Sequence, residues 1–179
     1  DTYTAPFNDQ KVRLAFAKAI DRESIVKNVV GSQFGIAAYS FLAPGFPASD
    51  SDGSLKSIQG YDCDAAKTLL SDAGYPDGKG FPDQELKLRN ENDAHKAWAV
   101  AAAGSISQCL NVKITVNNLE FKTYMDGLLA RPTTVQFAMI SYGMYYRDPS
   151  NMLGVWLSSG RHSWTNAEFD KLVNDAGVK

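Results

Sequence analysis

The residues best suited to chemistry are three tyrosines that follow an apolar segment late in the chain. Residues 135–141 form a short apolar run, and Tyr142, Tyr145 and Tyr146 come directly after it, around Gly143. Aromatic side chains bind ligands by stacking and apolar contact, and each phenol adds a hydrogen-bonding group. In open α/β sheets, ligands bind just beyond the carboxyl ends of the strands. The segment therefore predicts a binding surface, and an aromatic cover over the core is the alternative.

Residues suited to catalysis are sparse. His95 and His162 have no partner at the spacing of a metal site or a catalytic triad. The chain has no nucleophile elbow, no phosphate-binding glycine loop and no GxGxxG. Glu91, Asn92 and Asp93 could bind a cation or an amine, but their position ahead of a predicted helix is typical of a cap. The residues therefore predict no enzyme, no metal and no cofactor.

Cys63 and Cys109 are the chain's two cysteines, so at most one internal disulfide can form. Cys63 falls at the start of one predicted helix and Cys109 at the end of another. If both helices lie on the same face of a βαβ arrangement they run parallel, which separates the two sulfur atoms by a helix length. The sequence therefore favours two separate thiols and leaves a bridge open as the alternative.

Composition and charge narrow the class of protein. The 179 residues are 44% hydrophobic and 21% charged, which is typical of one globular domain with an apolar core. The formal net charge is −2 and no dense cluster of Lys or Arg is present, so we expect no nucleic-acid partner. No apolar run reaches membrane-spanning length, and no signal peptide is visible.

Capping residues and apolar spacing predict helices over much of the chain. Aspartates suited to N-caps precede several apolar-periodic stretches, and Pro149 suits a first helical position. The longest helix carries Trp98, Ala102, Ile106 and Cys109 at helical intervals, which predicts a buried stripe. The expected helices lie near residues 10–20, 21–30, 62–73, 92–110, 121–130, 149–157 and 169–176.

Three extended segments alternate with these helices. Residues 85–90 and 112–117 alternate apolar and polar side chains, and the run at 135–141 reads as a buried strand. Strand, helix, strand, helix, strand across 85–141 predicts crossover connections, and hence an α/β fold with a mixed, partly parallel sheet flanked by helices. Residues 31–60 hold many loop signals and predict a long surface excursion, with or without a function of its own.

Short motifs spread over residues 6–176 resemble those of a known family, and they occur in the family's order. On them, the chain resembles the second lobe of extracytoplasmic solute-binding proteins of the peptide/nickel type (solute-binding protein family 5). The matching residues are Phe7, Asp9, Val12, Arg13 and Ala15 with Ala19-Ile20-Asp21-Arg22; Tyr61-Asp62, Ala66-Lys67, Leu69-Leu70, Ala73-Gly74-Tyr75 and Asp77-Gly78; Asp148-Pro149; and Trp164, Asn166 and Phe169-Asp170.

The resemblance implies a two-lobed clamshell of the type II periplasmic-binding-protein kind. Residues 1–179 would be a single α/β lobe, a second-lobe fragment whose partner lobe is contributed by sequence on both sides. The family captures a peptide or similar small solute in the cleft between the lobes and delivers it to the permease subunits of an ABC transporter. The full-length protein would be periplasmic or otherwise extracytoplasmic, either secreted or lipid-anchored.

The resemblance also implies particular ligand-binding residues. The family's cleft aromatics fall on Phe121, after the second strand, and on Tyr142, after the third, with Tyr146 beside it. Arg131 lies near a position where the family sometimes places a ligand-facing arginine. In oligopeptide receptors, an acidic residue four positions before the proline of the Asp-Pro motif holds the ligand's amino terminus. That position here is Tyr145, which argues against simple recognition of a free amino terminus.

Two other functions are conceivable on the same scaffold. One is the ligand-sensing domain of a transcriptional regulator, which would be expected to carry a DNA-binding helix-turn-helix elsewhere in the gene product. The other is a hydrolase, which would need a nucleophile–base pair that the sequence does not show. Solute capture without catalysis is the function that the resemblance favours.

Overall fold

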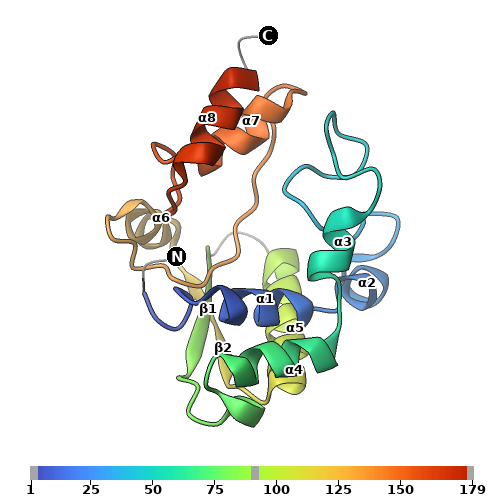
Figure 1. Cartoon of the computed structure of the whole chain (residues 1–179), viewed down its shortest axis with the longest axis vertical. Helices are drawn as coiled ribbons and strands as arrows, with labels where there is room; N and C mark the ends of the chain where they lie inside the picture. Colours follow the sequence, from blue (N-terminus) through green and yellow to red (C-terminus); the bar gives the residue numbers. More distant parts are fainter. Residues whose placement is uncertain (1–3, 90–92, 177–179) are drawn as a thin grey trace.

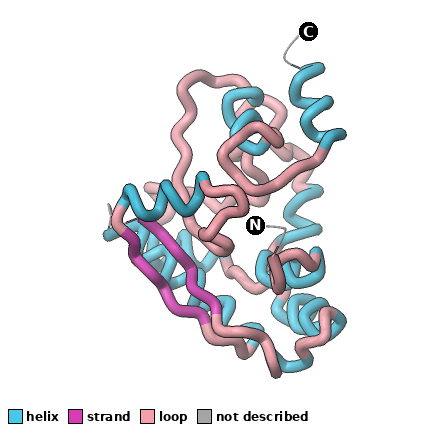
Figure 2. The backbone as a smooth tube through the Cα atoms, turned by 90° about the vertical axis from the view of Figure 1, so that its left-hand side faces the viewer, coloured by secondary structure: helices cyan, strands magenta, loops and turns pink. Residues whose placement is uncertain are grey.

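A small parallel sheet organises the chain. The computed structural model describes residues 4–89 and 93–176. Strand β1 (Gln84–Arg89) pairs in parallel with β2 (Ile114–Leu119), and helix α5 (Asp93–Leu110) connects them. Figure 2 shows the two strands side by side (magenta). The alternation of apolar residues therefore predicted the strands and their crossover, although β2 begins two residues later than the expected 112.

The predicted third strand exists only as a short bridge. Ala138 bridges Lys87 in the parallel sense, on the side of β1 away from β2. The Lys87 amide donates to the carbonyl of Phe137 (3.0 Å), and the Met139 amide donates to the carbonyl of Lys87 (2.9 Å). The segment 135–141 thus has the position and direction of a third strand without a continuous ladder, and the expectation of a regular strand was wrong.

The main core lies where three helices pack beside the sheet. Helix α1 (Gln10–Lys18) packs on α4 (Cys63–Asp72), and α4 packs on α5 (Figure 1). The residues predicted to share one face of the first helix were Val12, Ala15, Phe16, Ala19 and Ile20; the first four are buried and Ile20 is half-buried. The buried residues of this cluster are Phe7, Val12, Ala15, Phe16, Ala19, Ala66, Leu70, Ile106, Cys109, Leu110 and Val112.

Aspartate and glutamate side chains begin most of the helices, because a side-chain oxygen satisfies amide groups that the first helical turn leaves without partners. Asp9 accepts from the Lys11 amide at the start of α1, and Asp62 accepts from the Ala65 amide at the start of α4. Asp148 accepts from the Ser150 amide, with Pro149 at the first position of α7. The caps Asp62 and Asp148 were predicted from the sequence and are confirmed, and Asp9 is the cap where the sequence left Asn8 and Asp9 open.

The buried face of α5 differs from the predicted stripe by one residue along part of its length. Ala99 and Ala103 are buried against Leu86 and Leu88 of the sheet, whereas Trp98 is half-buried, with its ring 4.9 Å from that of His95. Small alanines let the helix approach the sheet closely, and the larger indole lies beside this contact. The described residues do not include Asn90, Glu91 and Asn92. Asn90 was predicted to end a strand, and Glu91 and Asn92 were predicted to bind a cation or to cap a helix.

A short helix and side-chain hydrogen bonds hold the segment 31–60 in place. It contains helix α3 (Ser54–Gln59) and follows α2 (Arg22–Ile25) and the π-helical turn η1 (Val26–Val30). The Tyr39 hydroxyl donates to Glu23 (3.0 Å), and Lys56 donates to the same carboxylate (3.2 Å). The Lys56 hydrogen bond and then that of Tyr39 lower the pKa of Glu23. The helical spacing of Ile25, Val26, Val29 and Val30 predicts an inward face, but none of the four is fully buried and Val29 is exposed.

A disulfide joins Cys63 to Cys109, with 5.6 Å between their Cα atoms. The expectation of two separate thiols was therefore wrong. The amino-terminal end of α4 meets the carboxyl-terminal end of α5, so the two cysteines lie together although each is at an end of its own helix. The bridge fastens α4 to the helix that crosses between the two strands.

The carboxyl-terminal part of the chain lies beyond the sheet. Helix α6 (Phe121–Leu129) follows β2, and the chain then runs through 130–148 to α7 (Pro149–Leu153), the 3₁₀ turn η3 (Gly154–Trp156) and α8 (Ala167–Ala176). Figure 1 shows α7 and α8 together above the rest of the molecule. A second 3₁₀ turn, η2 (Pro76–Gly78), precedes β1. None of the helices in the described ranges is long and apolar enough to span a membrane.

Candidate functional site

The carboxyl ends of the parallel segments bring a cation and an aromatic ring together. Arg89 ends β1, and its guanidinium carbon lies 5.5 Å from the ring centre of Phe121, the first residue of α6. The Arg89 Nη2 atom lies 3.5 Å from Oγ of Ser141, at the end of the third segment. Phe121 is 44% exposed. This edge therefore presents an accessible aromatic surface with a positive charge, which is the kind of site expected there.

Tyr142 and Tyr146 line a hollow of about 500 Å³ together with Asn151, Gly160 and Arg161. We call this surface the tyrosine hollow. The Tyr142 hydroxyl donates to the backbone carbonyl of Asn151 (3.3 Å), and the Arg161 guanidinium carbon lies 5.3 Å from the centre of the Tyr142 ring. The structure thus brings two of the predicted ligand residues together and adds a cation that sequence reasoning missed.

Tyr145 is 84% exposed, so its side chain faces solvent rather than the core. Its backbone amide donates to Oδ1 of Asn151 (3.0 Å), which fixes the tyrosine segment against α7. Tyr145 is absent from the residues that line the tyrosine hollow, whereas Tyr146, which is 56% exposed, is among them. The tyrosines therefore do not cover the main core, and they remain available to a ligand.

Arg131 has a different environment from the one expected of a ligand-facing arginine. Its Nη1 atom donates to the backbone carbonyl of Ala130 (3.0 Å), and its Nη2 atom donates to that of Gly160 (2.8 Å). A Cβ at Gly160 would lie 2.4 Å from the carbonyl oxygen of Val155, so this tight turn accepts only glycine without a shift. Arg131 thus fixes the segment that carries Arg161, which makes it a positioning residue.

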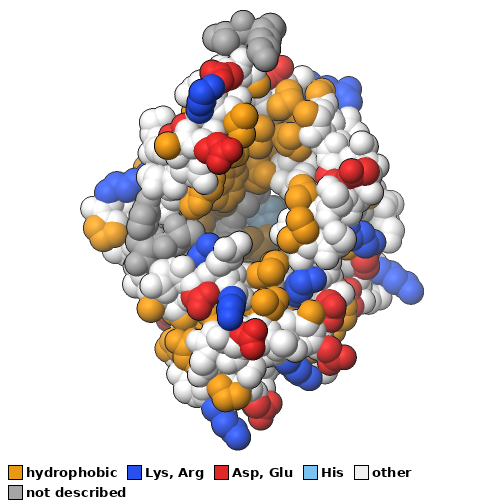
Figure 3. All heavy atoms as spheres, in the orientation of Figure 1, with side chains coloured by type: hydrophobic (Ala, Val, Ile, Leu, Met, Phe, Trp, Pro, Cys, Tyr) orange, Lys and Arg blue, Asp and Glu red, His pale blue; other side chains and the backbone are white. Residues whose placement is uncertain are grey.

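A second hollow is an apolar cavity of about 660 Å³ between the first core helix and the carboxyl-terminal segment. We call it the aromatic cavity. Figure 3 shows hydrophobic side chains around a deep hollow with a histidine at its base. None of the predicted site residues lines it. Its aromatic lining includes Phe7, Phe16, Phe41, Phe137, Trp156 and Trp164.

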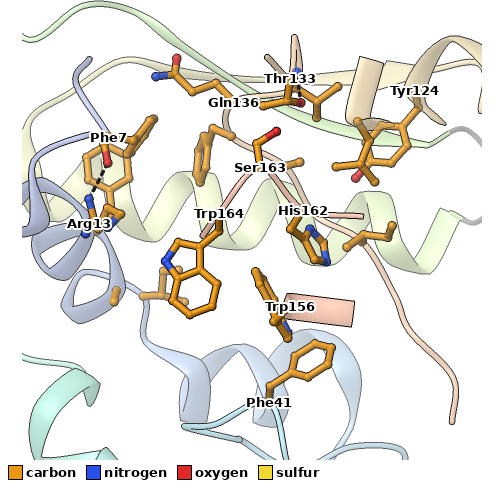
Figure 4. Close-up of a pocket in the computed structure, with 18 of the residues that line it drawn as sticks. Phe7, Arg13, Phe41, Tyr124, Thr133, Gln136, Trp156, His162, Ser163 and Trp164 are labelled. Carbon is orange, nitrogen blue, oxygen red and sulfur yellow. Dashed lines mark hydrogen bonds between the residues drawn. The ribbon is translucent and has the colours of Figure 1, made fainter. Parts of the chain in front are cut away.

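Several polar groups at the aromatic cavity are bonded within the protein, whereas the buried Trp156 Nε1 has no hydrogen-bond partner in the described part of the chain. Arg13 Nη1 donates to the carbonyl of Phe7 (2.8 Å), a contact drawn in Figure 4. His162 stacks on Trp156, with 4.0 Å between the ring centres and 19° between the planes. Burial, together with the smaller effect of the Arg161 and Arg131 charges, lowers the pKa of His162 to about 4. The imidazole is therefore neutral at pH 7, and the cavity wall is apolar.

The signal for the aromatic cavity was spread over distant parts of the chain. Its lining comes from the first helix, the 31–60 segment, the third extended segment and the region around 153–169. None of these carries a local motif for a pocket, so only the folded chain reveals it. Within the described ranges, no three His, Cys, Asp or Glu side chains are grouped as metal ligands. The geometry provides stacking, apolar contact and cationic groups, all of which serve binding.

Comparison with known families identifies this arrangement. The family described as bacterial extracellular solute-binding proteins, family 5 (middle region) matches residues 1–164. The chain belongs to this family. The family-5 resemblance predicted from the sequence motifs is therefore confirmed over almost the whole chain, and its members are solute-binding proteins rather than enzymes.

Relatives of this family-5 chain include two periplasmic proteins. It is 33% identical to the periplasmic oligopeptide-binding protein OppA of Salmonella typhimurium, over 96% of this chain and 32% of that protein. It is 32% identical to the periplasmic murein peptide-binding protein MppA of Escherichia coli, over 100% of this chain and 33% of the relative. The chain therefore spans about a third of the length of these relatives.

A solved structure shows the same fold. The crystal structure of an oligopeptide-binding protein, OppAIV, from Borrelia burgdorferi matches 98% of this family-5 chain and 34% of its own, with a TM-score of 0.80 and 25% identity. The predicted α/β fold of the type II periplasmic-binding-protein kind is confirmed by this similarity. The ligand residues predicted from the resemblance stay predictions, since the match concerns the backbone.

Proposed function

We propose that this chain is one lobe of the substrate-binding component of an ABC transporter. It captures a peptide or similar small solute outside the cytoplasmic membrane and delivers it to the permease subunits. The observation that carries the proposal is the family-5 match over residues 1–164. It is supported by the accessible aromatic side chains Phe121, Tyr142 and Tyr146 at the carboxyl edge of the sheet.

An extracytoplasmic location agrees with the cysteine chemistry. Disulfides form and persist in oxidising compartments such as the bacterial periplasm, and they are rare in the cytosol. The bridge between Cys63 and Cys109 fits that location. The relatives OppA and MppA are named as periplasmic proteins as well.

A single lobe leaves the solute site incomplete. Small-molecule sites usually bury most of the ligand surface, and clamshell proteins achieve this by closing two domains around the ligand. The tyrosine hollow is shallow, and the side chains of Tyr145 and Phe121 are exposed. We therefore propose that a second lobe of the full-length protein covers these aromatics and closes on the solute.

Native mass spectrometry of the full-length protein tests the proposed function. We expect a peptide or a similar small solute to co-purify with the two-lobed protein and to be released on denaturation. The 179-residue chain alone should bind the same solute only at millimolar concentration or worse. One lobe offers about half of the contacts, whereas the entropic cost of immobilising the ligand remains nearly the same. Micromolar binding to the single chain would contradict the two-lobed site.

Tyr145 supports a further expectation about peptide recognition. An ammonium group that leaves water needs a carboxylate or several acceptors, and a tyrosine provides a neutral hydroxyl and a π face. The full-length protein should therefore bind a free peptide and its N-acetylated form with affinities that differ by less than about tenfold.

Paired calorimetry of one peptide, free and acetylated, measures this difference. The variant Tyr145→Asp places a carboxylate at an exposed position and should create a preference for the free amine. Tyr145→Phe is the matched control, because it keeps the ring and adds no charge. A wild-type preference for the free amine above tenfold would show that another acidic group holds the amino terminus.

A further inference from the structure

A hydrogen bond joins the segment 31–60 to the tyrosine segment, which comprises residues 142–147. The Arg147 Nη2 atom donates to the backbone carbonyl of Gly45 at 2.7 Å, although 102 positions separate the two residues in the sequence. Figure 1 shows the loop of the segment 31–60 and the chain that leads into α7 approaching each other in the upper part of the molecule. A charged donor forms a stronger hydrogen bond than a neutral one, so this contact ties the two segments together.

Phe41 makes a second contact between the same two segments. Its ring centre lies 6.2 Å from that of Tyr142, with 37° between the planes. Phe41 also meets Trp156 edge to face, with 5.3 Å between the ring centres, and Figure 4 shows these two rings beside each other. Aromatic pairs at such distances attract each other beyond the area that they bury. Tyr142 lines the tyrosine hollow whereas Phe41 does not, so Phe41 contacts a candidate ligand residue from outside the hollow.

The part of the chain that carries Phe41 is itself anchored to α2. The Tyr39 hydroxyl donates to the carboxylate of Glu23, and the guanidinium carbon of Arg22 lies 5.4 Å from the centre of the Tyr39 ring. Leu42, the residue after Phe41, is buried. A side chain that is oriented in advance loses less conformational freedom when it binds a ligand. Because Phe41 is anchored in this way, it can hold the tyrosine ring that it contacts in one orientation.

We propose that Phe41 is a positioning residue for solute binding, which holds Tyr142 in the orientation that the tyrosine hollow requires. Arg147 keeps the two segments together beside this contact. The inference rests on the proposed function and gives the segment 31–60 a part in it. A side chain outside the hollow should therefore change the affinity for the solute, and it should do so only while the ring of Tyr142 is present.

A double-mutant cycle in the 179-residue chain tests the inference. The variants are Phe41→Leu, Tyr142→Leu and the combination of the two, and each change replaces a ring by an apolar side chain. Nuclear magnetic resonance of the isotope-labelled chain reports the environment of the Tyr142 ring before any ligand is added. A titration with acetyl-Ala-Phe-Ala-amide then measures millimolar dissociation constants. Both ends of this peptide are blocked, so it carries no charge.

We expect Phe41→Leu to shift the ring signals of Tyr142 and to weaken peptide binding about fivefold, the scale of one aromatic pair. In the Tyr142→Leu chain the same change should leave the affinity unaltered, because the ring through which Phe41 acts is gone. Phe41→Tyr keeps the ring and should bind as wild type does. The matched control is Phe34→Leu, since Phe34 is 81% exposed in the same segment, and it should change neither measurement.

Arg147→Gln tests the same link at an exposed position, where the substitution disturbs no packing. It removes the charged donor to the Gly45 carbonyl, so it should shift the ring signals of Tyr142 and weaken peptide binding about threefold. Arg147→Lys keeps a charged donor and should have a smaller effect. This variant gives the comparison even if Phe41→Leu does not fold, and the dispersion of the amide signals reports whether each chain is folded.

Equal weakening by Phe41→Leu with and without the ring of Tyr142 would overturn the inference, because Phe41 would then act independently of that ring. Unchanged Tyr142 signals or unchanged affinity in a folded Phe41→Leu or Arg147→Gln chain would also overturn it. These results would leave the proposed function standing, because the peptide would still bind. If wild type bound no peptide, positioning by Phe41 would likewise be refuted. The solute found by mass spectrometry with the full-length protein would then decide the proposed function independently.

Discussion

Loss of the Cys63–Cys109 disulfide should lower the free energy of unfolding by about 4 kcal/mol. The bridge closes a loop with a sequence separation of 46 residues. In the chain-entropy description, a cross-link restricts the unfolded chain, and a loop of this length corresponds to about 4 kcal/mol. The native protein also loses the covalent link between α4 and the crossover helix α5. Urea denaturation of oxidised and reduced wild-type protein measures the difference.

The double variant Cys63→Ala/Cys109→Ala provides the matched control. Cys109 is buried in the main core, so its replacement adds a packing cost that reduction alone does not. Either single variant should already lose the whole effect of the cross-link. If the reduced wild-type protein unfolded within about 1 kcal/mol of the oxidised form, the bridge would contribute little, and the expectation would be contradicted.

Local features were predicted well from the sequence because their causes are local. A cap depends on one side chain and the next few amide groups, so Asp62 and Asp148 could be assigned before the structure was known. The same holds for β1 and β2, whose alternation follows from one buried face. The third extended segment, residues 135–141, shows where prediction from local sequence fails. Its apolar residues predicted burial, but the length of its ladder depends on how β1 presents its free edge.

Features that depend on the path of the chain were predicted poorly. The disulfide required the end of α5 to meet the start of α4, and helix spacing within each segment carries no information about that meeting. The phase of α5 was misjudged because hydrophobicity favoured Trp98 for the buried stripe. The residues that pack against the sheet are instead the small Ala99 and Ala103, which allow a close approach of the helix.

In the candidate site too, local features were predicted from the sequence, whereas features that depend on tertiary structure were not. Tyr142 and Tyr146, which the resemblance predicted as ligand residues, line one hollow, because the motif and the strand end are local, and their role in binding stays a prediction. Arg161 lies on a turn with no recognisable pattern, and only tertiary structure brings it over Tyr142. Arg131 was predicted to face a ligand, but its guanidinium is occupied by backbone carbonyls from two segments. Residue type alone could not separate these two arginines.

The free energy of unfolding should fall as the pH is lowered from about 6.5 towards 4, and His162 should account for a distinct part of the loss. Burial first, and then the neighbouring charges of Arg161 and Arg131, together lower the pKa of His162 from 6.5 to about 4 in the folded chain. An unfolded chain takes up the proton near pH 6.5. Between these values the unfolded state binds more protons, so acid favours unfolding.

The size of this contribution follows from the difference between the two pKa values, which corresponds to about 3 kcal/mol when the pH has fallen below 4. The contribution is fully present above pH 6.5. His162→Gln removes the titrating group, so its free energy of unfolding should fall by about 3 kcal/mol less than that of wild type between pH 7 and pH 4. Comparing the two chains cancels the effect of acid on the carboxylates that both retain.

The variant His95→Gln serves as the matched control, because it removes a histidine that packs against Trp98 on α5, away from the aromatic cavity. Urea denaturation of the three proteins at several pH values gives the required free energies. If the free energy of unfolding fell by the same amount in wild type and in His162→Gln as the pH was lowered, His162 would titrate alike in the folded and unfolded chains. The stacking of the imidazole on Trp156 makes that outcome unfavourable, because a charged ring there would be half-buried beside Arg161 without a carboxylate partner among the described residues.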